Sequence, residues 1–192
     1  MPLENDHFKP TGLLTNKHIQ SILASSKARK WFLRHQSRAL REHEGAMVLD
    51  CGDGVRLHAL HSPQPRISAR PEQAKNNTKL VILIHGWEGS AESTYLLSTA
   101  SSLFNKGYSI VRLHLRDHGP SANLNEALFH AARLDEVAGA IRNIKSRLPY
   151  QTYSLVGFSL GGNIALRISQ RSEQERLQLS SVTAISPVIS PS

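Results

Sequence analysis

The sequence has few of the features that mark secreted, disulfide-bonded or membrane-spanning chains. It contains one cysteine, Cys51, among 192 residues, and a lone cysteine cannot form an internal disulfide. No apolar run approaches the roughly 20 residues that span a bilayer. The first ten residues, MPLENDHFKP, are acidic and polar, whereas a signal peptide begins with a basic and then an apolar segment. These absences predict a cytoplasmic protein in which Cys51 has a structural or incidental role.

The short motifs of nucleotide, metal and nucleic-acid binding are also absent. There is no P-loop, dinucleotide fingerprint or zinc-finger spacing, so we expect no cofactor and no metal. The net charge of +8 would suit a nucleic acid, but the charge is spread along the chain. Residues 1–75 carry 12 Lys and Arg against 7 Asp and Glu, and residues 76–192 carry 11 against 8. We therefore expect no nucleic-acid partner.

The length suits one domain, preceded by a polar, basic lead-in. We assign residues 1–44 to this lead-in segment and residues 45–192 to the core. Within the lead-in, KARKWFLRHQSRALR (residues 27–41) mixes basic side chains with Trp31, Phe32 and other apolar residues. We favour a helix that packs by its apolar stripe over contact with an anionic membrane surface, because the stripe is short.

The core alternates strand-like and helix-like segments. Two strand-like runs flank a Gly-Asp-Gly turn in residues 47–60, which predicts a hairpin. Apolar runs and periodicity then predict strands at 79–86, 108–116, 152–158 and 181–188, and helices at 92–107, 126–148 and 160–170. This alternation indicates an α/β fold with a mostly parallel sheet and crossover helices.

A serine lies where one of these strands meets the next helix. Gly157-Phe158-Ser159-Leu160-Gly161 matches G-x-S-x-G, and both the strand before it and the helix after it are predicted. In that context the serine occupies a sharp, strained turn, and side chains at the flanking glycines would collide with neighbouring elements. Ser159 is therefore the candidate nucleophile. The N–H of Leu160, at the start of the helix, is a candidate oxyanion donor.

Two further segments follow buried strands at the same edge of the sheet. In the first, His85-Gly86-Trp87-Glu88-Gly89-Ser90, the backbone N–H of Trp87 is the candidate second oxyanion donor. The second is Arg116-Asp117-His118-Gly119, in which we expect Arg116 and Asp117 to bond local backbone. His118 lies in the right layer for a catalytic base but in the wrong loop, so a structural role is favoured.

Two other histidines receive structural interpretations. We interpret His114, inside a predicted strand, as a core or lateral contact. His130 is expected to open the helix at 126–148 and to pack or cap there.

Taken together, HGWEGS, LRDHGPSANLNEALFHAARLDEV and VGFSLGGN resemble the α/β-hydrolase superfamily, and more narrowly its YheT-like branch of carboxylesterases. TNKHIQSI resembles that branch's Asn-x-His-x-Gln motif. The resemblance covers most of residues 10–188. It implies an α/β-hydrolase fold and a hydrolase acting on small-molecule or lipid esters of carboxylic acids. Ser159 would be the nucleophile, and the N–H groups of Trp87 and Leu160 would form the oxyanion hole.

The triad acid and base that the resemblance implies are missing from the expected places. Both should follow the serine in the chain, yet no histidine follows His130. The only carboxylates after Ser159 are Glu173 and Glu175, which precede the next predicted strand. We expect a hydrolase fold that is incomplete at its C-terminus, and we interpret the chain as a fragment of a longer hydrolase. A natural truncation and a partner subunit that supplies the rest are the alternatives. The alternative function is a non-catalytic domain that binds an acyl ligand or a protein.

Overall fold

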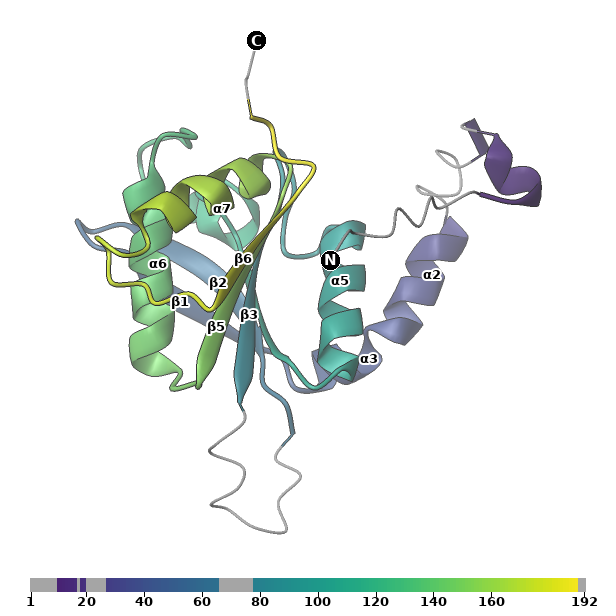
Figure 1. Cartoon of the computed structure of the whole chain (residues 1–192), viewed down its shortest axis with the longest axis horizontal. Helices are drawn as coiled ribbons and strands as arrows, with labels where there is room; N and C mark the ends of the chain where they lie inside the picture. The colour runs from purple at the N-terminus through teal and green to yellow at the C-terminus, as the bar shows by residue number, and fades with distance from the viewer. Residues whose placement is uncertain (1–9, 17, 20–26, 66–77, 190–192) are drawn as a thin grey trace, which may run out of the picture.

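The computed structural model describes residues 10–16, 18–19, 27–65 and 78–189, and in these residues helices flank one sheet (Figure 1). No helix in these ranges is long and apolar enough to cross a membrane. The strands are β1 Gly45–Asp50, β2 Arg56–Ser62, β3 Lys79–Ile84, β4 Ser109–Leu113, β5 Thr152–Phe158 and β6 Ser181–Ile185. The helices are α2 Lys27–Gln36, α3 Arg38–Glu42, α5 Thr94–Asn105, α6 Leu134–Arg147 and α7 Leu160–Arg171, with short 3-10 turns η1 Gly12–Thr15 and η2 Gly119–Asn123.

The six strands form one sheet in the order β1-β2-β4-β3-β5-β6. The strands β4, β3, β5 and β6 run parallel, and β1 and β2 are antiparallel neighbours at one side. This confirms the predicted hairpin and the mostly parallel sheet. Because four parallel strands end at the same edge, the segments that follow them meet there.

Hydrophobic side chains fill both faces of the sheet. Alternate residues of β3 point to opposite sides: Ile82 and Ile84 pack with α6 and α7, whereas Val81 and Leu83 pack with α5. All four are buried, which is the reason that this strand reads as a continuous apolar run.

The helix predicted over 126–148 begins only at Leu134, so that prediction is wrong for its first eight residues. Those residues form turns because their backbone groups bond to the loop after β4. Arg116 donates to the Ala127 carbonyl, and the Asp117 carboxylate accepts from the Phe129 N–H. His130 therefore lies in a turn and does not open a helix. Its ring accepts a hydrogen bond from the Ala132 N–H at 3.1 Å.

The strand predictions at 108–116 and 181–188 overrun the observed strands at their carboxyl ends. The strand β4 ends at Leu113 and β6 at Ile185. Ser186, the residue after β6, has a φ of +46°, which is incompatible with an extended strand. Both overruns fall where the chain leaves the sheet at the edge that carries the candidate site.

The lead-in also departs from expectation. Residues 27–41 form two helices that break at Ser37. Leu33 and Leu40 are buried, but Trp31 is 70% exposed and Phe32 61% exposed, so a packed apolar stripe is wrong for these two aromatic residues. Consecutive helical residues point about 100° apart, so the burial of Leu33 turns its two predecessors away from the body. The Asn-x-His-x-Gln motif lies partly outside the described residues, and the domain boundary at residues 44 and 45 stays a prediction.

Candidate active site

Ser159 occupies a sharp turn between β5 and α7. Its φ of +51° and ψ of −114° lie outside the regions that residues with a side chain normally adopt. Two backbone bonds hold it: its N–H donates to the Ile185 carbonyl at 2.9 Å, and its carbonyl accepts from the Asn163 N–H at 3.0 Å. Such a backbone costs roughly 1–3 kcal/mol and persists only where surrounding structure holds it. The strand, strained turn and helix are therefore present as the sequence predicts.

The two glycines of the motif are required by close packing of backbones. A Cβ at Gly157 would lie 2.0 Å from the Gly161 carbonyl oxygen, on the first turn of α7. A Cβ at Gly161 would lie 2.4 Å from the His85 carbonyl oxygen, at the end of β3. Real Cβ atoms do not approach other atoms so closely. The glycines thus allow α7 to begin directly against β5 and β3.

The loop after β3 lies against Ser159. A Cβ placed on Gly86 would be 3.2 Å from the Ser159 Cβ. The loop is fixed by the Gly86 N–H, which donates to the Tyr95 hydroxyl at 2.9 Å, and by the Gly89 N–H, which donates to the Gly86 carbonyl at 3.0 Å. Glu88 has a φ of +52°, so this loop is tightly turned as well. The structure therefore brings together the two segments that the sequence assigned to the site.

The two candidate oxyanion donors are backbone N–H groups in the loop after β3 and at the start of α7. Within the described part of the chain, neither the Trp87 N–H nor the Leu160 N–H has a hydrogen-bond acceptor. The indole of Trp87 is 65% exposed, and its centroid lies 6.1 Å from that of Phe129. Trp87 thus presents an aromatic surface beside the loop.

His85 is a structural residue that the sequence reasoning did not single out. Its Nδ1 is 2.7 Å from the Gly86 carbonyl oxygen, and its Nε2 is 3.1 Å from the Leu115 N–H. Nδ1 therefore carries the proton and Nε2 accepts. The ring is fully buried, and desolvation lowers its pKa to about 4. A neutral His85 thus ties the loop after β3 to the end of β4.

A buried ion pair shapes the loop after β4. Arg116 binds Glu136 of α6 with Nε–Oε1 and Nη2–Oε1 distances of 3.0 and 2.7 Å, and both side chains are almost fully buried. The pairing raises the pKa of Arg116. Arg116 also donates to the Ala127 carbonyl, and Asp117 has a φ of +59°. The backbone contacts expected of Arg116 and Asp117 are present, and the partner Glu136 is additional.

The histidines near this edge do not bond to Ser159. The Nδ1 of His118 lies 2.6 Å from the Arg116 carbonyl oxygen, and its ring packs against His85 at a centroid distance of 4.8 Å. His114 follows β4 as a buried core residue, and desolvation lowers its pKa to about 4. Within the described residues, the Ser159 hydroxyl has no hydrogen-bond partner. No catalytic base is therefore paired with it.

The later carboxylates are equally remote from a catalytic arrangement. Glu175 forms an ion pair with Arg142 of α6, and Glu173 is exposed. Across the described ranges, no three His, Cys, Asp or Glu side chains converge as metal ligands. Cys51 is buried, and desolvation raises its pKa to about 12, which makes it a poor nucleophile or ligand. Ser159 is the chemically distinctive residue of this edge.

The order of elements, the strained serine and the adjacent loop are those of one fold family. Residues 79–192, more than half of the chain, match the family model of the alpha/beta hydrolase fold. The chain belongs to the α/β-hydrolase fold family. In this family the sharp turn between a strand and a helix that carries the catalytic serine is called the nucleophile elbow.

Two curated relatives agree with the YheT-like branch that the motifs indicate. "Putative esterase YheT" of Escherichia coli (strain K12) is 28% identical over 97 residues, which are 50% of this chain and 28% of that protein. "Putative esterase/lipase" of Haemophilus influenzae (strain ATCC 51907 / DSM 11121 / KW20 / Rd) is 31% identical over 93 residues, covering 48% and 30%. The matches thus span less than a third of each relative.

Solved structures share the fold of this chain at low sequence identity. The Pyrococcus furiosus esterase Pf2001 has a TM-score of 0.61 and is 18% identical, with 76% of this chain and 52% of that chain covered. Est1E from Butyrivibrio proteoclasticus, solved with ferulic acid bound, has a TM-score of 0.58 and is 20% identical, with 73% and 52% covered. These likenesses support the fold of the α/β-hydrolase chain.

Proposed function

We propose that this α/β-hydrolase chain carries the nucleophile and oxyanion-binding half of a serine hydrolase acting on carboxylic esters. The observation that supports the proposal is the backbone of Ser159, held at a strained positive φ against Gly86 of the loop after β3. Strained residues of this kind cluster at functional sites.

The proposed chemistry uses three groups of this chain. Ser159 Oγ attacks the ester carbonyl carbon, and the N–H groups of Trp87 and Leu160 stabilise the resulting oxyanion. The bond from the carbonyl carbon to the alkoxy oxygen then breaks, and the alcohol leaves with the proton that a general base has taken from the serine hydroxyl. Water hydrolyses the acyl-serine to release the acid and restore the hydroxyl.

A general base and an acid are required, and the described residues do not pair any with Ser159. His85 holds the loop through both ring nitrogens, and His118 is bonded to the Arg116 carbonyl. We propose that the base and the acid come from residues outside 1–192 or from a partner. Without them, the serine of this chain would retain only the weak reactivity of an unassisted hydroxyl.

Covalent labelling tests the nucleophile. A fluorophosphonate probe should label the full-length protein, and Ser159→Ala should abolish the labelling. Ser154→Ala is the matched control, because Ser154 lies on the same strand, where Ser181 donates to its hydroxyl at 2.9 Å. Equal labelling of Ser159→Ala and the parent would show that another residue is the nucleophile.

The oxyanion role of Trp87 is tested by removing its N–H. Trp87→Phe keeps the N–H and an aromatic ring, whereas Trp87→Pro removes the donor. Loss of one such donor lowers kcat by about 10²–10³. We expect that loss in the proline variant alone, with circular dichroism confirming that both variants are folded. Equal kcat values in the two folded variants would exclude a role for this N–H.

The absence of a base bonded to Ser159 favours one alternative: a non-catalytic domain that binds an acyl ligand or a protein. Ester turnover separates the two functions. A folded, full-length protein that hydrolyses neither short nor medium acyl esters, yet binds a fatty acid saturably, would support the alternative.

A further inference from the structure

The aromatic pair, Trp31 and Phe32 on α2, is exposed although both side chains are large. Trp31 is 70% exposed and Phe32 is 61% exposed, while the next residue, Leu33, is only 4% exposed. The helix therefore uses Leu33 to pack on the body and turns the aromatic pair outward. Among the residues that the structure describes, Trp31 stacks on His35 of the same helix, at a centroid distance of 6.2 Å. Adjacent exposed aromatic residues of this size indicate a contact surface.

The sequence around the aromatic pair is strongly basic. Residues 27–41 contain six Lys and Arg and no Asp or Glu. Two of these arginines are paired with carboxylates, Arg38 with Glu42 and Arg41 with Glu92. Even with both pairs discounted, the segment keeps an excess of positive charge. A surface that attracts this segment must combine negative charge with an apolar layer.

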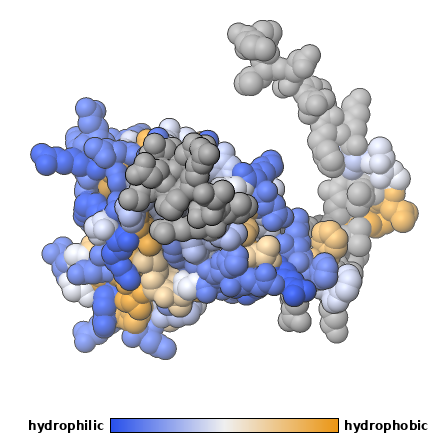
Figure 2. Space-filling model, turned by 90° about the horizontal axis from the view of Figure 1, so that it is seen from below, coloured by the Kyte–Doolittle hydropathy of each residue, from blue (hydrophilic) through white to orange (hydrophobic). Residues whose placement is uncertain are grey.

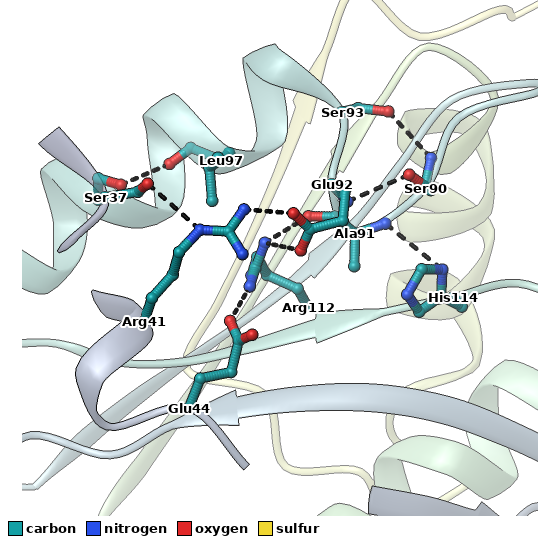
Figure 3. A network of polar contacts seen from close by, with 11 residues as sticks. Ser37, Arg41, Glu44, Ser90, Ala91, Glu92, Ser93, Leu97, Arg112 and His114 are labelled. Carbon is teal, nitrogen blue, oxygen red and sulfur yellow. Dashed lines mark hydrogen bonds and ion pairs between the residues drawn. The ribbon is translucent and has the colours of Figure 1, made fainter. Parts of the chain in front are cut away.

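The segment that follows the aromatic pair in the chain, α3 and Glu44, is fixed to the body of the protein. Leu40 of α3 belongs to the core cluster of α5. Figure 3 shows a polar network that joins the same region to the sheet: Arg41 binds Glu92, and the fully buried Arg112 of β4 binds Glu44 and Glu92. Figure 2 shows hydrophobic side chains on the N-terminal segment at the right, and a further hydrophobic area at the lower left of a body that is otherwise mostly hydrophilic in this view. The aromatic pair is thus presented from an anchored segment.

We infer that this face docks on the surface of an anionic lipid bilayer. Indole and phenyl rings partition to the headgroup level of a membrane, and Lys and Arg nearby are attracted to anionic lipids. This combination distinguishes a bilayer from a purely apolar protein groove. The inference does not depend on the proposed ester chemistry. It reverses the preference drawn from the sequence, because the aromatic pair does not pack on the core.

Vesicle sedimentation tests the inference. The full-length protein should sediment with vesicles of phosphatidylcholine and phosphatidylserine, bind pure phosphatidylcholine vesicles much more weakly, and be released by salt. Trp31→Ala/Phe32→Ala should lower the affinity about tenfold or more, because two rings no longer enter the interface. Val48→Ala removes an apolar side chain that is 45% exposed on β1, and it should bind like the parent.

Tryptophan fluorescence of the 192-residue chain locates the contact, because residues 1–192 contain two tryptophans, Trp31 and Trp87. In Trp87→Phe, the emission of Trp31 should shift to the blue and be quenched by brominated lipid when anionic vesicles are added. In Trp31→Phe, the emission of Trp87 should stay unchanged, although the protein still binds.

Four results would overturn the inference. The folded parent could fail to bind anionic vesicles, or the double alanine variant could bind them as tightly as the parent. A response confined to Trp87 would show that the protein meets the membrane through the site loop. A parent that is dimeric, becomes monomeric in the double alanine variant and ignores vesicles would assign the aromatic pair to a second copy of the chain.

Discussion

A single methyl group at Gly161 should open the elbow, because the backbone of α7 lies directly on the end of β3. In Gly161→Ala the new Cβ would lie 2.4 Å from the His85 carbonyl oxygen and 2.6 Å from that of Ile84. Both are backbone atoms of a buried strand end, so neither can rotate away. The helix must instead move by about 1 Å from the strand to restore normal contact distances.

The magnitude follows from two opposing effects. Overpacking of this kind costs about 1–3 kcal/mol, and rigid backbone neighbours place Gly161→Ala at the upper end. Alanine returns up to about 1 kcal/mol through its helix propensity. The free energy of unfolding should fall by about 2 kcal/mol, which lowers Tm by about 4–8 °C for a chain of this size. In an active full-length protein, the displacement of Ser159 should lower kcat by about 10²-fold.

Gly162→Ala is the matched control, one residue further along the same helix. Its Cβ would lie 3.2 Å from the Gly157 carbonyl oxygen and 3.2 Å from the Pro187 Cβ, so a shift of a few tenths of an ångström suffices. The free energy of unfolding should change by less than about 1 kcal/mol. Urea denaturation of the three proteins, with ester turnover beside it, measures both effects. Equal stabilities for the two alanine variants would refute the reasoning about the elbow.

Three other predictions concern buried groups. His85 and His114 have pKa values lowered to about 4 from an ordinary 6.5, so the unfolded chain binds their protons first. Stability should be complete above about pH 6.5 and fall by about 1.4 kcal/mol per pH unit for each histidine as the pH drops toward 4. Urea midpoints against pH measure this, and an unchanged slope in His114→Gln would contradict it. Glu136→Gln breaks the buried pair with Arg116 and should lower the free energy of unfolding by about 3 kcal/mol. The control Asp135→Asn removes a carboxylate that is 83% exposed and should cost less than about 1 kcal/mol. Coincident thermal melts of the two variants would contradict this prediction. Burial raises the pKa of Cys51 to about 12, so the thiol of the native protein should react with a thiol reagent at pH 8 far more slowly than the thiol of the unfolded chain. A fast reaction in the native protein would show that Cys51 is accessible and would contradict this prediction.

The strands, the elbow and the loop after β3 could be predicted because their signals are local. A strand buried on both faces must be apolar throughout, as residues 79–84 are, and a tight turn needs glycines where Cβ atoms would collide, as at Gly157 and Gly161. Parallel strands then carry their following segments to one edge of the sheet. Ser159 and Gly86 are adjacent for that reason, although more than 70 residues separate them in sequence.

The parts that could not be predicted depend on partners distant in the chain. The periodicity of residues 126–148 favours one helix, yet bonds to Arg116 and Asp117 hold residues 127–129 in turns. The structural role of His85 requires the Leu115 N–H, which β4 places beside it. The sequence alone does not show whether Leu33 or Trp31 is the buried residue, because this short basic helix has no single apolar face.

The amino-acid sequence by itself determined the α/β alternation, the glycine-flanked serine and the lack of a histidine after His130. Only the tertiary structure decided that Ser159 lies against Gly86 and that Trp31 and Phe32 face outward. It also decided that hydrogen bonds of His85 and Arg116 hold neighbouring segments together. Local conformational preferences act over a few residues and can be read in order along the chain. Contacts between strand ends and the choice of which helical face is buried depend on packing across the whole sheet.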